Sequence, residues 1–135
     1  MGKAIRPNST LATLVLLLAV SQVALCQCAA GRCTPLRKAP EVARQAGNPY
    51  EGQAVAAQAG ARLFRRHCAS CHGSDAKGGV GKAPPLLSAE VKAAQPGALF
   101  WVLRNGSLGS GMPSFSWLPD ERRWQIITWL RRMNE

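Results

Sequence analysis

The sequence predicts an all-α domain between residues 54 and 135, because its apolar residues recur at helical spacing and no segment has the alternating pattern of a strand. The first apolar stripe lies in 54–67 and consists of Ala56, Ala59, Gly60, Leu63 and Phe64. A second stripe, near the C-terminus, consists of Ile126, Trp129, Leu130 and Met133. Glycine on the first stripe would let another helix cross closely. A total of 135 residues suits one small domain with terminal extensions.

Proline and glycine divide the rest of this region into helices and loops. Residues 73–87 contain four glycines and two prolines and are predicted to form a loop. A short helix is expected at 88–94, and a longer one begins at Pro96, which suits a first helical turn, and ends at Gly106. A second loop, 106–118, carries Met112. The last helix follows Pro119, with acidic residues in its first turn and arginines in its last, as the helix dipole favours.

The N-terminal segment is predicted to lie outside the folded domain. Residues 1–30 have a basic start, an apolar run at 11–20 and small residues at the end, which is typical of a secretory signal peptide. A retained membrane helix is the alternative, although the apolar run is shorter than the roughly 20 residues that span a bilayer. A lipid anchor on Cys26 or Cys28 is a third reading. Residues 31–53 are rich in Ala, Pro and Gly and are expected to form a helix-free linker or surface arm.

The chain is strongly basic, with a formal net charge of +10 from 17 Lys and Arg against 7 Asp and Glu. This balance predicts an acidic partner surface, with solubility alone as the alternative explanation. Nucleic acid is not expected, since the sequence has no long Lys/Arg block and begins with an export signal. Cys33 is left as a lone thiol without an assigned role.

The chemistry is concentrated in Cys68-Ala69-Ser70-Cys71-His72, which has the spacing of a c-type haem attachment site. Two thiols two residues apart can each bond one vinyl group of a porphyrin as a thioether, and His72 would then bind the iron. A thioredoxin-like redox pair would need strands, and a structural zinc site would need further ligands that the chain does not supply. The sequence therefore predicts one covalently attached haem c.

The candidate for the sixth iron position is Met112, in the loop sequence GSGMPSF, 40 residues after His72. Met133 is interpreted as a core residue of the last helix. The other histidine, His67, adjoins the attachment motif and is expected on the surface. Ligation by His and Met raises the potential relative to two histidines and leaves no vacancy for a substrate.

A metal-bound histidine usually donates its second ring N–H to an oxygen, and the segment Ala83-Pro84-Pro85-Leu86 is best placed to supply a carbonyl. Haem propionates need donors. Arg104, Trp101 and Trp117 are the candidates, and Arg104 is preferred. An equally weighted alternative is that Arg104 is a charge that faces solvent.

These residues together resemble class I cytochromes c. Gly60, Phe64 and Cys68 are similar to the first-helix pattern of that family, Pro84 and Leu86 resemble its proline-x-leucine segment, and Met112-Pro113 resembles its distal loop. Trp129-Leu130 resembles the aromatic-aliphatic pair of its last helix, which crosses the first helix at the glycine. The resemblance implies a cytochrome c-like fold over 54–135, with three or more short helices and loops around one haem, and a proline carbonyl that meets His72.

The predicted function is therefore single-electron transfer between periplasmic or membrane redox partners, without enzymatic activity. Small bacterial cytochromes that serve quinoprotein-type dehydrogenases are similar, so a dehydrogenase donor and an oxidase or cytochrome acceptor are expected, docked through lysines such as Lys77, Lys82 and Lys92. The alternative is a haem enzyme or gas sensor with an open sixth position. The protein is expected to be exported and monomeric, with membrane association only if the signal is retained or a cysteine is lipidated.

Overall fold

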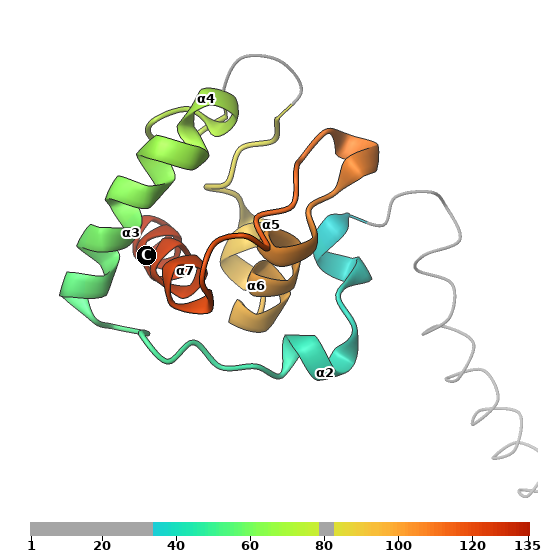
Figure 1. The fold of residues 1–135 in the computed structure, drawn as a ribbon, viewed down its shortest axis with the longest axis horizontal. Coiled ribbons are helices and arrows are strands. Elements are labelled where there is room, and N and C mark those ends of the chain that lie inside the picture. Colours follow the sequence, from blue (N-terminus) through green and yellow to red (C-terminus); the bar gives the residue numbers. More distant parts are fainter. Residues whose placement is uncertain (1–33, 79–82) are drawn as a thin grey trace, which may run out of the picture. The chain divides into compact units, whose positions relative to one another are not determined.

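The computed structural model describes residues 34–78 and 83–135, and all regular structure in these ranges is helical. The elements in chain order are η1 (Pro35–Lys38), α2 (Glu41–Arg44), α3 (Ala54–His67), α4 (Ala69–His72), α5 (Ala89–Ala93), α6 (Pro96–Asn105), η2 (Leu108–Ser110) and α7 (Asp120–Met133) (Figure 1). Within the described ranges the extended backbone pairing is an isolated bridge between Ser107 and Met112. The predicted all-α class is confirmed.

The two longest helices, α3 and α7, make the most extensive contact in the fold and cross at Gly60 (Figure 1). A Cβ atom on Gly60 would lie 1.9 Å from the backbone oxygen of Gln125, so only a residue without a side chain permits this approach. One turn further along α3, the ring of Phe64 packs 4.4 Å from that of Trp129, measured between centroids. Phe64 and Ile127 are almost completely buried at this crossing.

The shorter helices α5 and α6 pack beside this pair, and local signals in the sequence explain where each begins and ends. The Ser88 side chain accepts a hydrogen bond from the backbone N–H of Val91 at 3.3 Å and so caps α5. Pro96 occupies the first turn of α6, and Gly106 follows its last residue with a positive φ of 70°. These boundaries agree with the sequence expectation to within a residue or two.

The segment before α3 is more ordered than the sequence indicates. Its prolines were expected to exclude helix, but Pro35 is the first residue of η1 and Pro40 is the N-cap of α2. The prediction was wrong because the fixed φ of proline disfavours a helix interior but suits a helix start. Ala39 is buried, Gly97 of α6 lies against the carbonyl oxygen of Ala43, and Pro35–Glu135 form one compact unit. The domain boundary at residue 54 stays a prediction.

One core assignment is wrong, and several predicted features fall outside the described residues. Met133 was interpreted as a core residue, but it is the last residue of α7 and is 43% exposed, whereas Leu130, one turn earlier on the same stripe, is buried. The signal segment 1–30 and the residues Cys33 and Lys82 lie outside the described ranges. None of the described helices combines the length and apolar character needed to cross a membrane.

Candidate functional site

The motif Cys68–His72 forms a separate helical turn at the end of α3. Cys68 ends α3 and, with φ of −121°, breaks the helical path and begins α4. Its carbonyl oxygen accepts hydrogen bonds from the backbone N–H groups of Cys71 at 3.1 Å and His72 at 2.9 Å. One turn of backbone therefore holds Cys68, Cys71 and His72 close to one another.

The two thiols have different surroundings, and neither is in a disulfide. Cys68 is buried in the core cluster, whereas Cys71 is exposed. Burial raises the pKa of the Cys68 thiol to about 11, and the nearby Cys71 contributes in the same direction. A buried neutral thiol is a poor nucleophile. A thioether at this position has no ionised form, so it suits the apolar site better than a thiolate would.

The imidazole of His72 is buried and has a fixed orientation. Its Nδ1 lies 3.0 Å from the carbonyl oxygen of Pro84, and because a carbonyl can only accept, Nδ1 must carry the proton. The opposite nitrogen, Nε2, then has a lone pair available for a metal. The structure thus brings together His72 and the proline carbonyl that the sequence placed there, although their role toward iron stays a prediction.

The loop between His72 and Pro84 returns to the site through backbone hydrogen bonds. The N–H of Gly78 donates to the His72 oxygen at 3.1 Å, and the N–H of Leu86 donates to the Ala76 oxygen at 2.8 Å. Ala76 is completely buried and has a positive φ of 59°, an uncommon conformation for a residue with a side chain. These contacts hold the proline segment against the imidazole.

Met112 lies in a loop with a defined backbone. Ser107 and Met112 exchange two backbone hydrogen bonds, at 2.9 and 3.1 Å, which close the tip of the loop. Gly111 before it has φ of 75°, in the left-handed region that favours glycine. The Met112 side chain is partly buried and packs against the core cluster that also contains Cys68. The loop therefore holds the Met112 thioether against the apolar core, and its role toward iron stays a prediction.

The predicted propionate donors are near the surface. The Arg104 side chain is exposed, and its backbone oxygen accepts a hydrogen bond from the Ser114 hydroxyl at 2.6 Å. Trp117 is 63% exposed and meets the ring of His67 edge-on, with centroids 5.2 Å apart. The roles of Arg104 and Trp117 toward a haem stay predictions, as does the surface role of His67.

Sequence reasoning missed Arg123, a buried arginine near the start of α7. It is 3% exposed, donates from Nη1 to the Phe115 oxygen at 3.0 Å and pairs with Asp120. A signal was present, since Arg123 stands three and four residues before Ile126 and Ile127 on the buried side of α7. The residue was overlooked because arginine is rarely buried.

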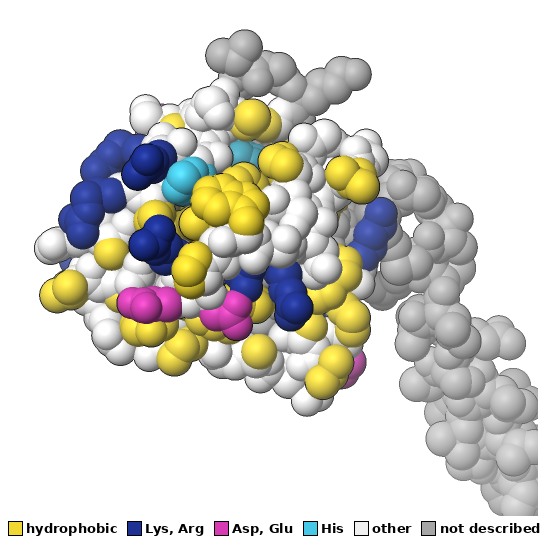
Figure 2. Space-filling view, viewed as in Figure 1, with side chains coloured by type: hydrophobic (Ala, Val, Ile, Leu, Met, Phe, Trp, Pro, Cys, Tyr) yellow, Lys and Arg dark blue, Asp and Glu magenta, His cyan; other side chains and the backbone are white. Residues whose placement is uncertain are grey.

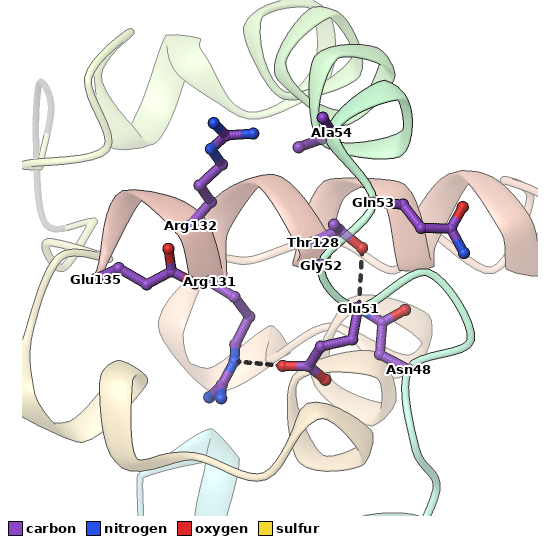
Figure 3. A pocket seen from close by; sticks show the side chains of 10 residues that line it. Asn48, Glu51, Gly52, Gln53, Ala54, Thr128, Arg131, Arg132 and Glu135 are labelled. Carbon is purple, nitrogen blue, oxygen red and sulfur yellow. Dashed lines mark hydrogen bonds and ion pairs between the residues drawn. The ribbon is translucent and has the colours of Figure 1, made fainter.

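A polar pocket lies at the other end of α3, away from the attachment turn (Figure 3). Its lining includes Ala54 at the start of α3, together with Glu51, Arg131 and Arg132. Arg131 forms an ion pair with Glu51 at 3.5 Å, which Figure 3 shows across the pocket. Since α3 has 14 residues, its two ends are roughly 20 Å apart. This pocket is therefore separate from the predicted haem site.

The chain's own residues fit a haem c group. Two unpaired thiols on one turn match the two thioether bonds, the oriented imidazole leaves Nε2 for iron, and the surrounding cluster is apolar. An all-α domain with this attachment turn defines a c-type cytochrome of the class I type.

Comparison with known proteins identifies the family. Residues 55–130 match the model of the family described as cytochrome c oxidase, cbb3-type, subunit III, and the chain belongs to this family. The cofactor of such a cytochrome domain is covalently bound haem c, and its function is electron transfer.

A curated relative agrees with this assignment. The cbb3-type cytochrome c oxidase subunit CcoP of Rhodobacter capsulatus is 40% identical over 68 residues, which cover 49% of this chain and 23% of the relative. The chain thus matches less than a quarter of that relative's length. No solved structure shows significant similarity to the chain.

Proposed function

We propose that this chain carries single electrons between exported redox proteins, with Cys68 and Cys71 as the residues that would attach a haem c and His72 and Met112 as those that would bind its iron. The observation that carries the proposal is the hydrogen bond from His72 Nδ1 to the carbonyl oxygen of Pro84. His72 lies on the same helical turn as both thiols. A haem c held by these residues would supply a one-electron redox couple. The chain orients the imidazole through Pro84 and surrounds Cys68 with apolar side chains.

Met112 decides between the electron carrier and its alternative. A thioether on the sixth position would leave no site for a substrate or a gas, so electrons would pass without bond formation. The partly buried side chain and the closed loop around it support this reading. If Met112 does not bind the iron, the open position would instead favour an enzyme or a gas sensor.

The partner is proposed to present an acidic surface near the attachment turn. Arg62, Arg65 and Arg66 are exposed on α3, the helix that leads directly into Cys68. Figure 2 shows Lys and Arg side chains over this helix, beside the histidines and a group of hydrophobic side chains. The relative is named as an oxidase subunit, so an oxidase is the favoured partner, and a quinoprotein-type dehydrogenase is the alternative donor.

The proposed location is the periplasmic side of the membrane. The basic and apolar pattern of residues 1–30 supports export, and retention of that segment or lipidation of Cys26 or Cys28 would anchor the protein. The intact mass of the purified protein distinguishes cleavage, retention and lipidation.

Methionine substitution tests the proposed ligation. In the haem-loaded protein, Met112→Ala should abolish the weak long-wavelength band of ferric sulfur–iron ligation, permit rapid binding of carbon monoxide to the ferrous form and lower the reduction potential. Met133→Ala is the matched control, because Met133 is exposed on α7 and its loss should change none of these properties. The visible spectra of both forms give the result.

Two outcomes would contradict the proposal. If the unmodified protein lacks the long-wavelength band and binds carbon monoxide readily, the sixth position is open and the alternative function is favoured. If the purified protein is colourless and has the mass of the polypeptide alone, the haem assignment itself fails.

A further inference from the structure

We infer that Arg123 is a positioning residue for Met112, because its guanidinium ties the methionine loop to α7. The inference rests on the proposed ligation by Met112 and adds the device that keeps this ligand in place. It concerns a residue whose side chain lies outside the attachment motif and the loop itself.

The contact that carries the inference is made at Phe115, three residues after Met112. Arg123 Nη1 donates to the Phe115 oxygen at 3.0 Å, and the Phe115 N–H donates to the Leu103 oxygen at 2.9 Å. The backbone of Phe115 is therefore fixed from two sides, by α7 and by the end of α6. Its ring is also buried in the core.

The guanidinium is itself held in one orientation. It pairs with the carboxylate of Asp120 one turn earlier on α7, and its central carbon lies 4.8 Å from the centroid of the Phe100 ring. Phe100 in turn stacks on Trp124, with centroids 4.2 Å apart. An ion pair on one side and an aromatic face on another leave Nη1 directed at the loop.

Stability alone does not account for an arginine here. Its Nε is buried and has no hydrogen-bond partner among the described residues, which carries an energetic cost. The carboxylate of its partner Asp120 is exposed, so solvent screens the attraction between the two charges, and this ion pair is weak evidence of a stabilising role. What an apolar residue could not supply is the hydrogen bond to the Phe115 carbonyl.

The expected consequence follows from the way the loop is attached. Between Gly106 and Phe115 the loop is closed on itself by the Ser107–Met112 pairing, so its position depends on its two ends. Loss of the Arg123 bond would leave the end nearer to Met112 held by hydrogen bonds to α6 alone, from the Phe115 N–H and the Ser114 hydroxyl, and so less firmly placed against α7. Because a thioether is a weak ligand of ferric iron, an added nitrogen ligand would then displace Met112 more easily.

The test compares Arg123→Met and Arg123→Lys with Arg122→Met, in the full haem-loaded chain. Arg122 is the exposed neighbour on the same helix, so its replacement removes the same charge without touching the loop. Titration with imidazole, followed by loss of the long-wavelength band, should show about tenfold tighter binding for Arg123→Met, as expected for the loss of one charge-assisted hydrogen bond. Arg123→Lys, which keeps a cationic donor, should lie between Arg123→Met and the unmodified protein.

Amide hydrogen exchange provides a second readout that does not depend on the iron. The N–H groups of Met112 and Phe115 should exchange faster in Arg123→Met, while those at the centre of α3 should be unchanged. If Arg123→Met does not fold, the same two measurements on Arg123→Lys decide the question.

The inference is overturned if imidazole affinity and loop exchange in the Arg123 variants equal those of Arg122→Met. Failure of the proposed function is distinguishable, since the unmodified protein would then lack the sulfur–iron band before any substitution at Arg123.

Discussion

A pair of buried polar side chains connects the segment before α3 with α7. Asn48 donates from Nδ2 to the Thr128 hydroxyl oxygen at 2.9 Å, and the Thr128 hydroxyl donates to the Trp124 carbonyl oxygen at 2.9 Å. The other end of the Asn48 amide accepts from the Tyr50 N–H at 3.0 Å. Both residues are more than nine-tenths buried, so each of these bonds replaces one to water.

Thr128→Val should destabilise the domain by about 1–3 kcal/mol, because valine keeps the shape but leaves the buried Asn48 Nδ2 without an acceptor. Thr128→Ser is the control, since it retains the hydroxyl and removes a methyl group. Urea unfolding of the haem-loaded protein, followed by far-UV circular dichroism, measures the difference. Equal stability of the two variants would mean that the hydrogen bond contributes nothing.

For single residues, the sequence predicts a role where that role depends on local spacing along the chain. Cys68, Cys71 and His72 stand out because one helical turn places them together, whatever surrounds that turn. Arg123 and Thr128 could not be predicted in the same way, because their roles come from partners that only the folded chain brings near. Burial of a polar group is decided by tertiary contacts, which a single residue type does not encode.

Gly60 is the position at which the two longest helices meet. A methyl group there would lie 1.9 Å from the Gln125 oxygen, and this oxygen belongs to the backbone of α7 and cannot rotate away. The helices would have to separate, with loss of packing between Phe64 and Trp129, whose rings are 4.4 Å apart.

Gly60→Ala is therefore expected to lower the free energy of unfolding by about 3 kcal/mol, although alanine is the better helix former. Gly47→Ala is the matched control, because nothing lies within 4 Å of a Cβ at that position. Thermal unfolding of both variants, monitored by circular dichroism, gives the comparison. A Gly60→Ala protein as stable as the Gly47→Ala control would show that the helices do not cross so closely.

Most helices could be predicted from the sequence, but the short helices η1 and α2 could not. The segments that became α3, α6 and α7 contain apolar residues at helical spacing, and α5 and α6 also have capping, proline or glycine residues at their ends. The short helices η1 and α2 have no such stripe and depend on contact with α6, where Ala39 is buried. Their order is thus a tertiary effect, and composition alone indicated a linker.

For the whole molecule, the most general property is its charge of +10. Such an excess creates a positive potential around the protein, which attracts anionic partners and repels cationic ones. In α3, the exposed arginines Arg62, Arg65 and Arg66 bring part of this charge close to the attachment turn. Arg132 belongs to α7 and lines the pocket beside Ala54, at the opposite end of α3.

Electron exchange with small inorganic complexes should therefore depend on salt, with opposite signs for opposite charges. Reduction of ferricyanide, an anion, by the ferrous protein should slow steeply between about 0.01 M and about 1 M salt, as the screening length falls from about 30 Å to about 3 Å. A cationic cobalt(III) complex should instead react faster at high salt. Stopped-flow absorbance of the haem measures both rates.

Two substitutions distinguish local from overall charge in this experiment. Arg66→Gln removes a charge two residues from Cys68, and Arg132→Gln removes one on α7, in the pocket at the opposite end of α3, a helix roughly 20 Å long. At moderate salt, where the screening length is about 10 Å, only the nearer charge should be felt at the site of electron transfer. Arg66→Gln should therefore slow the ferricyanide reaction several-fold more than Arg132→Gln does. Equal effects would place the electron-transfer surface elsewhere on the molecule, and rates independent of salt would exclude electrostatic docking.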